Sequence, residues 1–249
     1  MKSALHMLTF CAVLLGIVVA RVEEPIALNF NSDLLVRAMG VSLCVRRCID
    51  PFLDEMGKIW HMEKLVDSVK PLCTKHAQAM DCLRKSPSCD THHIFNKASA
   101  SIAKICGERA ALFDKMRPCL AKYADATAKG CDAKCHGRAN LTEFLNKPAI
   151  IRAAKTGGNI LAVNDNIGGM CSALSCELSC VTTELNKVCP LSGWLMLDIL
   201  LEPFDSVADL LLNSSPSLKD FISKKLDRRC RFLVQKSEIM KLRKGQFHH

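Results

Sequence analysis

The chain has 249 residues, of which 49% are apolar and 24% charged, and its formal net charge is +9 at pH 7. That balance is typical of globular proteins and excludes an intrinsically disordered chain. Aromatic residues make up only 5% of the chain. Base stacking would therefore have few side chains to use, and we expect no nucleic-acid partner.

The first twenty residues have the layout of a secretory signal peptide. Lys2 supplies a positive charge, an uncharged apolar run extends from Met7 to Ala20, and charged residues begin at Arg21. This run is shorter than the roughly 18 residues that a membrane span requires. We therefore expect cleavage after residue 20, a secreted extracellular protein and no transmembrane anchor.

Cleavage would remove Cys11 and leave fourteen of the fifteen cysteines in the mature chain. Disulfides form and persist in the oxidising compartments through which exported proteins pass, so we expect seven of them. The spacing alone does not determine which cysteines pair. The expected disulfide cysteines are Cys44, Cys48, Cys73, Cys82, Cys89, Cys106, Cys119, Cys131, Cys135, Cys171, Cys176, Cys180, Cys189 and Cys230.

The sequence pattern predicts an all-α fold, because alternating strand patterns are short and Asn-Gly or Asp-Gly hairpin turns are absent. Residues 21–43 form an N-terminal segment with a first helix. Residues 44–221 form a cysteine-rich helical domain, and residues 222–249 form a basic C-terminal segment.

Prolines mark several expected boundaries along this domain. A helix is expected to break at Pro71, where a new helix would have proline in its first turn, and the chain should turn at Pro87. Apolar residues between 102 and 123 fall near one helical face. Pro118 is the expected break in that helix.

Three cysteine pairs are spaced four residues apart, which places both sulfur atoms on one face of a helix. Two such helices packed antiparallel could be joined by two disulfides, in a disulfide-stapled arrangement. The alternative, in which each cysteine pairs elsewhere, stays open. The three pairs are Cys44/Cys48, Cys131/Cys135 and Cys176/Cys180.

Glycine pairs at 156–159 and 168–169 bracket the most loop-like part of the chain. The segment 191–212 is strongly apolar but is interrupted by acidic residues and Pro203. A buried pair of helices is the expected structure there. As an alternative, this segment could line a lipid cavity.

Catalytic and metal-binding motifs are missing from the sequence. Cysteines and histidines could hold zinc, but oxidation during export argues against a metal site. The run 131–136 resembles a haem attachment motif, yet three residues separate its cysteines where two are expected. No Gly-x-Ser-x-Gly or His-Glu-x-x-His is present, nor is the histidine–aspartate motif of secreted phospholipase A2. We expect no cofactor and no enzymatic activity; a small disulfide-rich hydrolase and a lipid carrier remain as alternatives.

Residues 222–249 carry nine basic and two acidic side chains, whereas the net charge of residues 21–221 is only +1. This concentration predicts a polyanion-binding site. At helical spacing, Ile222, Leu226 and Leu233 would face inward. Alternatively, the cations are solvated side chains that favour a helix C-terminal dipole. The candidate binding residues are Lys224, Lys225, Arg228, Arg229 and Arg231.

Two Asn-x-Ser/Thr sequons, at Asn140 and Asn213, predict N-glycosylation in an exported chain. A glycan at either position would mark an exposed surface.

The order of the cysteines and several flanking residues resemble the domain of nematode chondroitin proteoglycan 4. The similar stretches are 44–52, 105–109, 117–124, 131–135 and 171–189, together with Cys73, Cys82 and Cys89. This resemblance implies a secreted, disulfide-bonded, non-catalytic extracellular protein. Extracellular matrix proteins or glycosaminoglycans are the partners that it implies.

Chondroitin attachment requires a serine followed by glycine in an exposed stretch, usually with acidic residues nearby. The chain has one such dipeptide, at Ser192 and Gly193, and it lies beside an apolar run without acidic neighbours. Ser192 is therefore the candidate attachment residue, but we expect it to be buried in a turn.

Overall fold

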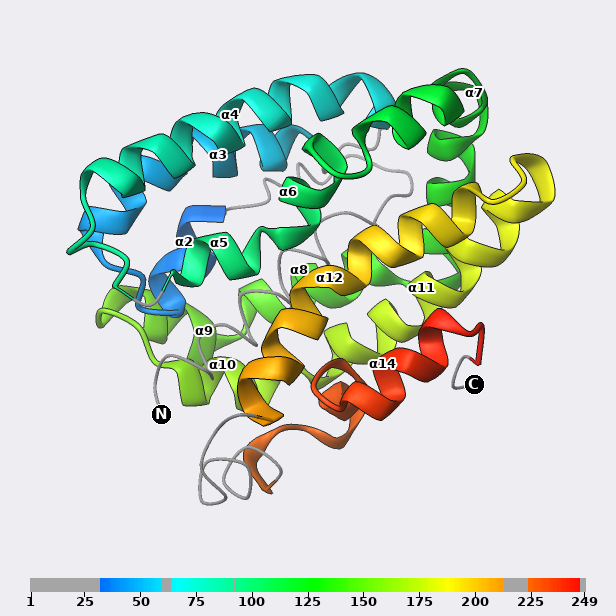
Figure 1. Ribbon diagram of the computed structural model, residues 1–249. Helices are drawn as coiled ribbons and strands as arrows, with labels where there is room; N and C mark the ends of the chain where they lie inside the picture. Colours follow the sequence, from blue (N-terminus) through cyan, green and yellow to red (C-terminus); the bar gives the residue numbers. More distant parts are fainter. Residues whose placement is uncertain (1–31, 60–63, 92, 213–223, 247–249) are drawn as a thin grey trace.

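The structure is a computed structural model that describes residues 32–59, 64–91, 93–212 and 224–246. Every regular element in these ranges is helical (Figure 1), which confirms the expected all-α fold class. The expected signal peptide, Asn213 and Ile222 lie outside the described residues. The elements are α2 (Ser32–Ala38), α3 (Leu43–Ile59), α4 (Leu65–Lys85), α5 (Ile94–Ala98), α6 (Ala100–Cys106), α7 (Ala110–Cys135), α8 (Gly137–Asn146), α9 (Pro148–Lys155), α10 (Ile160–Asn166), α11 (Gly168–Val188), α12 (Ser192–Leu212), the 3-10 helix η1 (Arg228–Leu233) and α14 (Lys236–Arg243).

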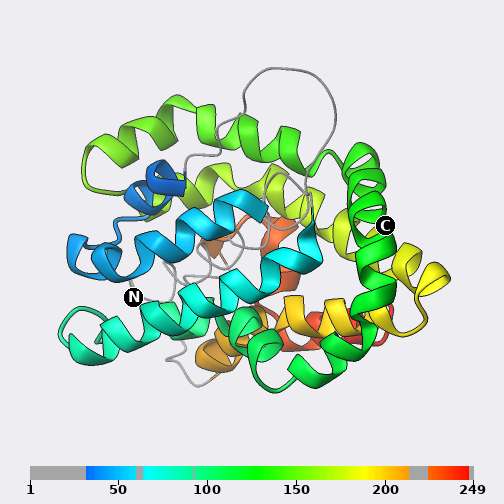
Figure 2. The ribbon, with the colours of Figure 1, turned by 90° about the horizontal axis from the view of Figure 1, so that it is seen from above.

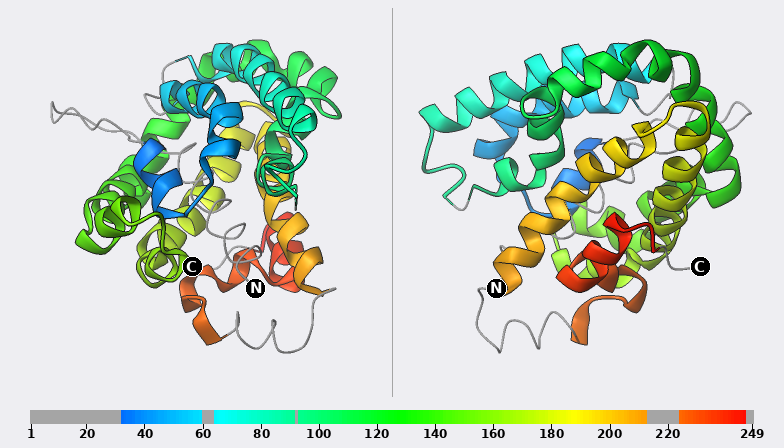
Figure 3. Two further views of the ribbon diagram at one scale, coloured as in Figure 1. Left: turned by 90° about the vertical axis from the view of Figure 1, so that its left-hand side faces the viewer. Right: turned by 45° about the vertical axis from the view of Figure 1, so that its right-hand side comes forward.

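Helix α11 lies at the centre of the packing and contacts α7, α8, α12 and η1. Its buried residues include Leu174, Leu178 and Leu185, whose spacing places them along one helical face. Helix α12 packs on α11, α6 and α14 and runs diagonally across Figure 1. In the left view of Figure 3, α9 and α10 lie on one side of α11, and α12 and α14 lie on the other.

Helices α3 and α4 lie side by side, as Figure 2 also shows from above. Between them and α5, the ring of Phe52 packs edge-on against Phe95, with ring centres 5.3 Å apart, and against His76 at 5.7 Å. The Ser99 hydroxyl donates to the Phe95 carbonyl, so the ring Nε2–H of His76 donates to the Ser99 oxygen at 2.8 Å. His76 is therefore a hydrogen-bonded core residue.

Among the described residues, the buried apolar side chains form two clusters. The larger cluster includes side chains from Leu35 in α2 to Leu242 in α14. The smaller cluster lies between α4, α6, α7, α11 and α12, and it consists of Val66, Ile105, Phe113, Leu120, Leu185, Leu195 and Ile199.

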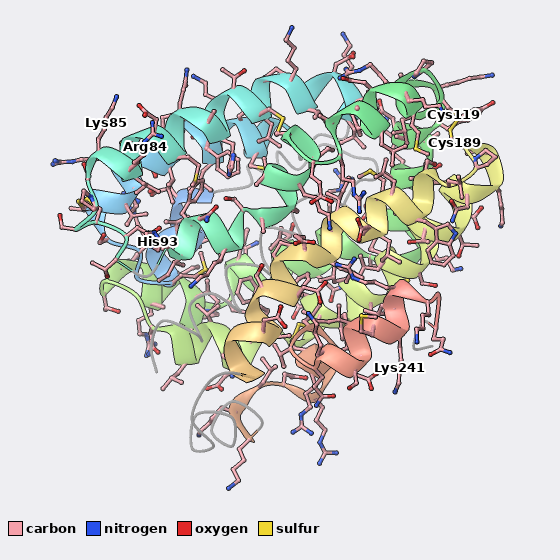
Figure 4. The ribbon with its side chains drawn as sticks, in the orientation of Figure 1. Arg84, Lys85, His93, Cys119, Cys189 and Lys241 are labelled. Carbon is pink, nitrogen blue, oxygen red and sulfur yellow. A yellow bond between two sulfur atoms is a disulfide. The ribbon has the colours of Figure 1, made fainter. Side chains whose placement is uncertain are left out.

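All fourteen expected cysteines lie in seven disulfides, which confirms the expected cross-linking. Two of the disulfides join α7 to α11, and a third joins α7 to Cys189 at the end of α11 (Figure 4). The N-terminal cysteines connect α3 to α4 and to the turn after it, and α4 to α6. The pairs are Cys44–Cys89, Cys48–Cys82, Cys73–Cys106, Cys119–Cys189, Cys131–Cys180, Cys135–Cys176 and Cys171–Cys230.

The expected breaks at Pro71 and Pro118 are wrong, because α4 and α7 continue through both residues. A proline inside a helix removes one backbone hydrogen bond and costs about 3 kcal/mol. Each of these prolines lies within two residues of a bridged cysteine, Cys73 or Cys119, so disulfides and packing hold the helix on both sides. The expected turn at Pro87 is present, directly after α4.

Two further boundaries differ from the expectation. The helical pattern between 102 and 123 is interrupted at Gly107, which ends α6 before α7 begins. The apolar segment 191–212 forms the single helix α12, which includes Pro203, and not a pair of helices. Packing against α6, α11 and α14 along its length holds this helix together.

The expected loop at 156–159 connects α9 to α10 and contains a very close backbone approach. Gly158 has a φ of +100°, and a Cβ at this position would lie only 2.2 Å from the Cα of Gly40. The N–H of Asn159 donates to the carbonyl of Ala38 at 2.8 Å, which joins the loop to the end of α2. The rest of the expected loop-like interval is wrong, because residues 160–166 form α10 and the glycines at 168 and 169 begin α11.

Candidate functional site

The basic segment that we define as residues 224–231 combines exposed cations with buried anchors. Lys224, Lys225 and Arg228 are exposed, whereas Leu226, which lies between them, and Leu233, which lies just after the segment, are buried as expected. The helical spacing suggests a continuous helix through this segment, and that expectation is wrong. The 3-10 helix η1 begins only at Arg228, directly after Asp227, which has no regular secondary structure.

Asp227 determines where η1 begins, and it also pairs with the side chain of Arg229. Its carboxylate accepts the backbone N–H of Arg229 at 2.9 Å and caps η1. It also accepts from the Arg229 guanidinium at 2.8 Å, and this hydrogen bond holds the pKa of Asp227 below its usual range. The charge of Arg229 is thus partly compensated. Arg229 is exposed but pairs with Asp227, and Arg231 is half-buried; Lys224, Lys225 and Arg228 are the other exposed cations of the segment.

The basic segment is fixed to the body of the protein at two points. Cys230 is bridged to Cys171 near the beginning of α11, and the side-chain amide of Asn164 donates to the carbonyl of Lys225 at 2.6 Å. The segment is therefore a constrained surface element that presents its cations in one arrangement.

Cations further along the C-terminal region are paired with acidic residues. The Nζ atom of Lys236 lies 3.1 Å from Oδ1 of Asp205 and 3.0 Å from Oδ1 of Asp209. Arg243 forms ion pairs with Asp198 and Asp205 of α12. The acidic residues that interrupt the apolar segment 191–212 are thus counter-ions for α14, and the positive charge of α14 is largely balanced within the fold.

The two modification candidates inside the described residues are both partly or fully enclosed. Ser192 is completely buried at the start of α12, and its hydroxyl donates to the carbonyl of Cys189 at 2.7 Å, as expected for a buried-turn residue. Asn140 is half-buried within α8, and its side-chain amide donates to the carbonyl of His136 at 2.8 Å.

An apolar cavity of about 130 Å³ lies beside the smaller core cluster. Its walls come from α3, α4, α6, α7, α11 and α12, and they include Phe113, Leu120 and Ile199. Helix α12 contributes to these walls, as the lipid-cavity alternative for the segment 191–212 requires. Nearly all lining residues are aliphatic or aromatic; the charged exception is Glu177 of α11.

Glu177 is a buried carboxyl group without a partner. It is 1% exposed, and neither of its oxygens has a hydrogen-bond partner among the described residues. Burial, with a smaller contribution from the charge of Asp132, raises its pKa to about 9. At neutral pH the carboxyl is therefore protonated, with one O–H donor and a carbonyl acceptor facing an apolar space.

Two disulfides bring Glu177 and Asp132 together. Cys176 and Cys131 are the chain neighbours of these two acids, and both are bridged between α7 and α11. Asp132 itself is satisfied, because it accepts from the backbone N–H of Arg138 at 3.0 Å and pairs with its guanidinium at 3.3 Å.

Glu177 is not among the residues predicted above, although its position in the sequence carries a signal. Glu177 follows Leu174 by three residues and precedes Val181 by four, so it falls on an apolar face of α11. A charged residue on such a face is a candidate for a functional site, since buried carboxyl groups are costly unless they are partnered.

The described residues include no group of histidine, cysteine, aspartate or glutamate side chains that could hold a metal ion. None of the described helices is long and apolar enough to cross a membrane.

Comparison with known proteins confirms the resemblance noted in the sequence. The family described as Chondroitin proteoglycan 4 matches residues 33–229. Chondroitin proteoglycan 4 of Caenorhabditis elegans is 20% identical over 255 aligned residues, which cover 80% of this chain and 32% of that protein. The chain thus spans about a third of the length of the curated relative it matches. No solved structure matches the chain.

Proposed function

Since the chain belongs to the chondroitin proteoglycan 4 family, we propose that it is a secreted, non-enzymatic structural or interaction protein of the extracellular matrix that binds polyanions. The basic segment 224–231 is the proposed binding element. Seven disulfides support the extracellular assignment, because such cross-links persist in oxidising compartments. Glycosaminoglycans are the proposed polyanions.

The observation that carries this proposal is the constrained placement of the exposed cations. Lys225 and Arg228 are exposed and make no ion pair within the described part of the chain. The Cys171–Cys230 disulfide and the Asn164 hydrogen bond hold the backbone around them. Binding a sulfated chain would therefore require little ordering of the protein, which favours affinity.

The proposed role is to bind glycosaminoglycan and not to carry a chain at Ser192. A buried hydroxyl that already donates to Cys189 is a poor acceptor for a sugar-transferring enzyme. Treating the naturally secreted protein with chondroitinase should therefore leave its intact mass and gel mobility unchanged. A diffuse heavy band that collapses after treatment would show that the protein carries chondroitin, and Ser192→Ala would then locate the chain.

The binding proposal is tested with chondroitin sulfate chains and the triple variant Lys224→Gln/Lys225→Gln/Arg228→Gln. Binding should weaken about tenfold at low ionic strength, because three exposed ion pairs contribute roughly 0.5 kcal/mol each. Wild-type binding should also decrease steeply as salt is added. Calorimetric or surface-based titration at several salt concentrations measures both effects.

A matched control removes the same charge elsewhere. Lys115, Lys122 and Lys134 are exposed on α7, and their joint substitution by glutamine changes the net charge equally. This control should bind like the wild type. Equal loss in both triple variants would mean that only the overall charge matters, and unchanged binding in the 224/225/228 variant would overturn the proposal.

A further inference from the structure

The cavity beside the smaller core cluster is large enough to hold a ligand. Its volume of about 130 Å³ is close to that of an engineered apolar cavity of about 150 Å³ that stays dry and binds benzene. Side chains such as Val69, Ile105 and Leu185 offer aliphatic contacts over most of its wall. An apolar molecule or an alkyl chain would therefore gain contacts that the empty cavity lacks.

Glu177 makes this cavity different from a packing defect. A buried polar group without a hydrogen bond costs about 1–3 kcal/mol, and native structures contain few of them. Both oxygens of Glu177 lack a partner among the described residues, and the residue lines the cavity. A ligand that carries a polar group would satisfy the carboxyl group and fill the apolar space together.

The charges around the cavity select the type of polar group. A fatty carboxylate is disfavoured because no cation among the described residues lines the cavity and Asp132 lies near Glu177. The pairing of Asp132 with Arg138 weakens its attraction for a cationic ligand. A neutral hydroxyl can accept the proton of the Glu177 carboxyl or donate to its carbonyl oxygen.

We propose that the cavity binds a neutral single-chain amphiphile, with its alkyl chain against the walls from α4, α7 and α12 and its hydroxyl group hydrogen-bonded to Glu177. This site is separate from the basic segment 224–231, and it gives the protein a second binding activity independent of polyanions.

The test compares four probes of equal chain length, namely 1-octanol, octylamine, octanoate and octane, by calorimetric titration of the full secreted chain. The wild type should bind 1-octanol most tightly. Glu177→Gln keeps a neutral hydrogen-bonding group and should retain this binding. Glu177→Leu should bind 1-octanol about tenfold more weakly than the wild type. Its affinity for octane should stay unchanged.

A control on the same helix is Glu184→Leu, two turns further along α11. Glu184 is exposed and pairs with Lys187, so this variant should bind all four probes as the wild type does. Absence of 1-octanol binding in the wild type would overturn the proposal. Tighter binding of octylamine, or equal binding of 1-octanol by wild type and Glu177→Leu, would overturn it as well.

A second pair of variants keeps the test decisive if Glu177→Leu does not fold. Ala124 lines the cavity from α7, whereas Ala126 on the same helix is exposed. Ala124→Leu should fill part of the space and abolish 1-octanol binding, and Ala126→Leu should not change it. Unchanged binding in Ala124→Leu would show that the alcohol binds elsewhere.

Discussion

At the scale of single residues, Glu177 links the cavity to the stability of the fold. Burial and Asp132 raise its pKa from 4.5 to about 9. Between these values the folded protein holds a proton that the unfolded chain has released, so the stability decreases as the pH rises through this window. Between about pH 4 and pH 7 the loss amounts to about 3 kcal/mol.

Glu177→Gln removes the titrating group and should remove this pH dependence. Relative to wild type, the unfolding free energy of the variant should therefore increase by about 3 kcal/mol between about pH 4 and pH 7. Guanidinium unfolding with intact disulfides, carried out at both pH values, measures this difference in unfolding free energy. Glu184→Gln is the exposed control and should follow the wild type. Parallel pH profiles for Glu177→Gln and wild type would contradict the prediction.

Gly158 provides a second prediction at this scale. A Cβ at Gly158 would be 2.2 Å from the Cα of Gly40, and the φ of +100° is unfavourable for alanine. Because backbone atoms cannot move aside cheaply, Gly158→Ala should destabilise the protein by about 3 kcal/mol. Thermal unfolding monitored by circular dichroism would measure this loss.

Gly157 is the matched control for Gly158. Its φ of +86° imposes the same backbone preference, but its Cβ position is open. Gly157→Ala should therefore cost only about 1 kcal/mol, which is the conformational part alone. Equal losses in both variants would mean that the approach of α2 to the loop 156–159 does not limit the packing.

At the scale of elements, the helices follow from apolar periodicity, but their boundaries do not. Proline predicted breaks at Pro71 and Pro118 because the local cost of a proline inside a helix is real. Packing and the nearby disulfides overcome that cost in α4 and α7. Local sequence carries no information about those long-range contacts, and the pairing of fourteen cysteines depends on the same contacts.

The candidate sites were also predictable only as far as they depend on local sequence and not on long-range contacts. The cations of the basic segment 224–231 are visible as a charge cluster in the sequence, but the capping of η1 by Asp227 is a feature of three-dimensional structure. Glu177 could be placed on an apolar face of α11 from its spacing. The missing partner of its carboxyl group becomes visible only when α4, α6 and α12 surround it.

Several ion pairs meet at Asp198 and join α6, α12 and α14. The Oδ2 atom of Asp198 lies 3.2 Å from Nζ of Lys104 and 3.1 Å from Nη2 of Arg109. The same carboxylate also pairs with Arg243. Although burial alone would raise its pKa, these cations lower it. This contribution to stability is therefore present above about pH 4 and is lost as the pH falls through the lowered pKa.

Asp198→Asn should destabilise the protein by about 2 kcal/mol at neutral pH, because three partly buried cations lose one shared counter-ion. Asp114, whose side chain is 64% exposed and pairs with Arg117, is the control. Asp114→Asn should change the stability by less than about 0.5 kcal/mol. Denaturant midpoints at neutral pH measure both values, and a loss in Asp198→Asn as small as in the control would refute the predicted role.

At the scale of the whole molecule, the disulfides connect elements that are distant in sequence, and they also position the basic segment 224–231. The Cys171–Cys230 disulfide joins residues 59 positions apart, and Cys119–Cys189 joins residues 70 positions apart. In the chain-entropy description, loops of these lengths stabilise the folded state by similar amounts, about 4 kcal/mol each. Only the first disulfide holds the proposed polyanion-binding element.

Replacing each pair by alanine separates stability from binding. Both double variants should lose about 4 kcal/mol of unfolding free energy, but only Cys171→Ala/Cys230→Ala should bind chondroitin sulfate more weakly, because it releases the constrained cations. Cys119→Ala/Cys189→Ala, which removes the link between the middle of α7 and the end of α11 (Figure 4), should bind like the wild type. Equal affinities in both variants would mean that the charge of the segment suffices, without the constraint. Weaker binding in the first variant alone would make this disulfide part of the binding site.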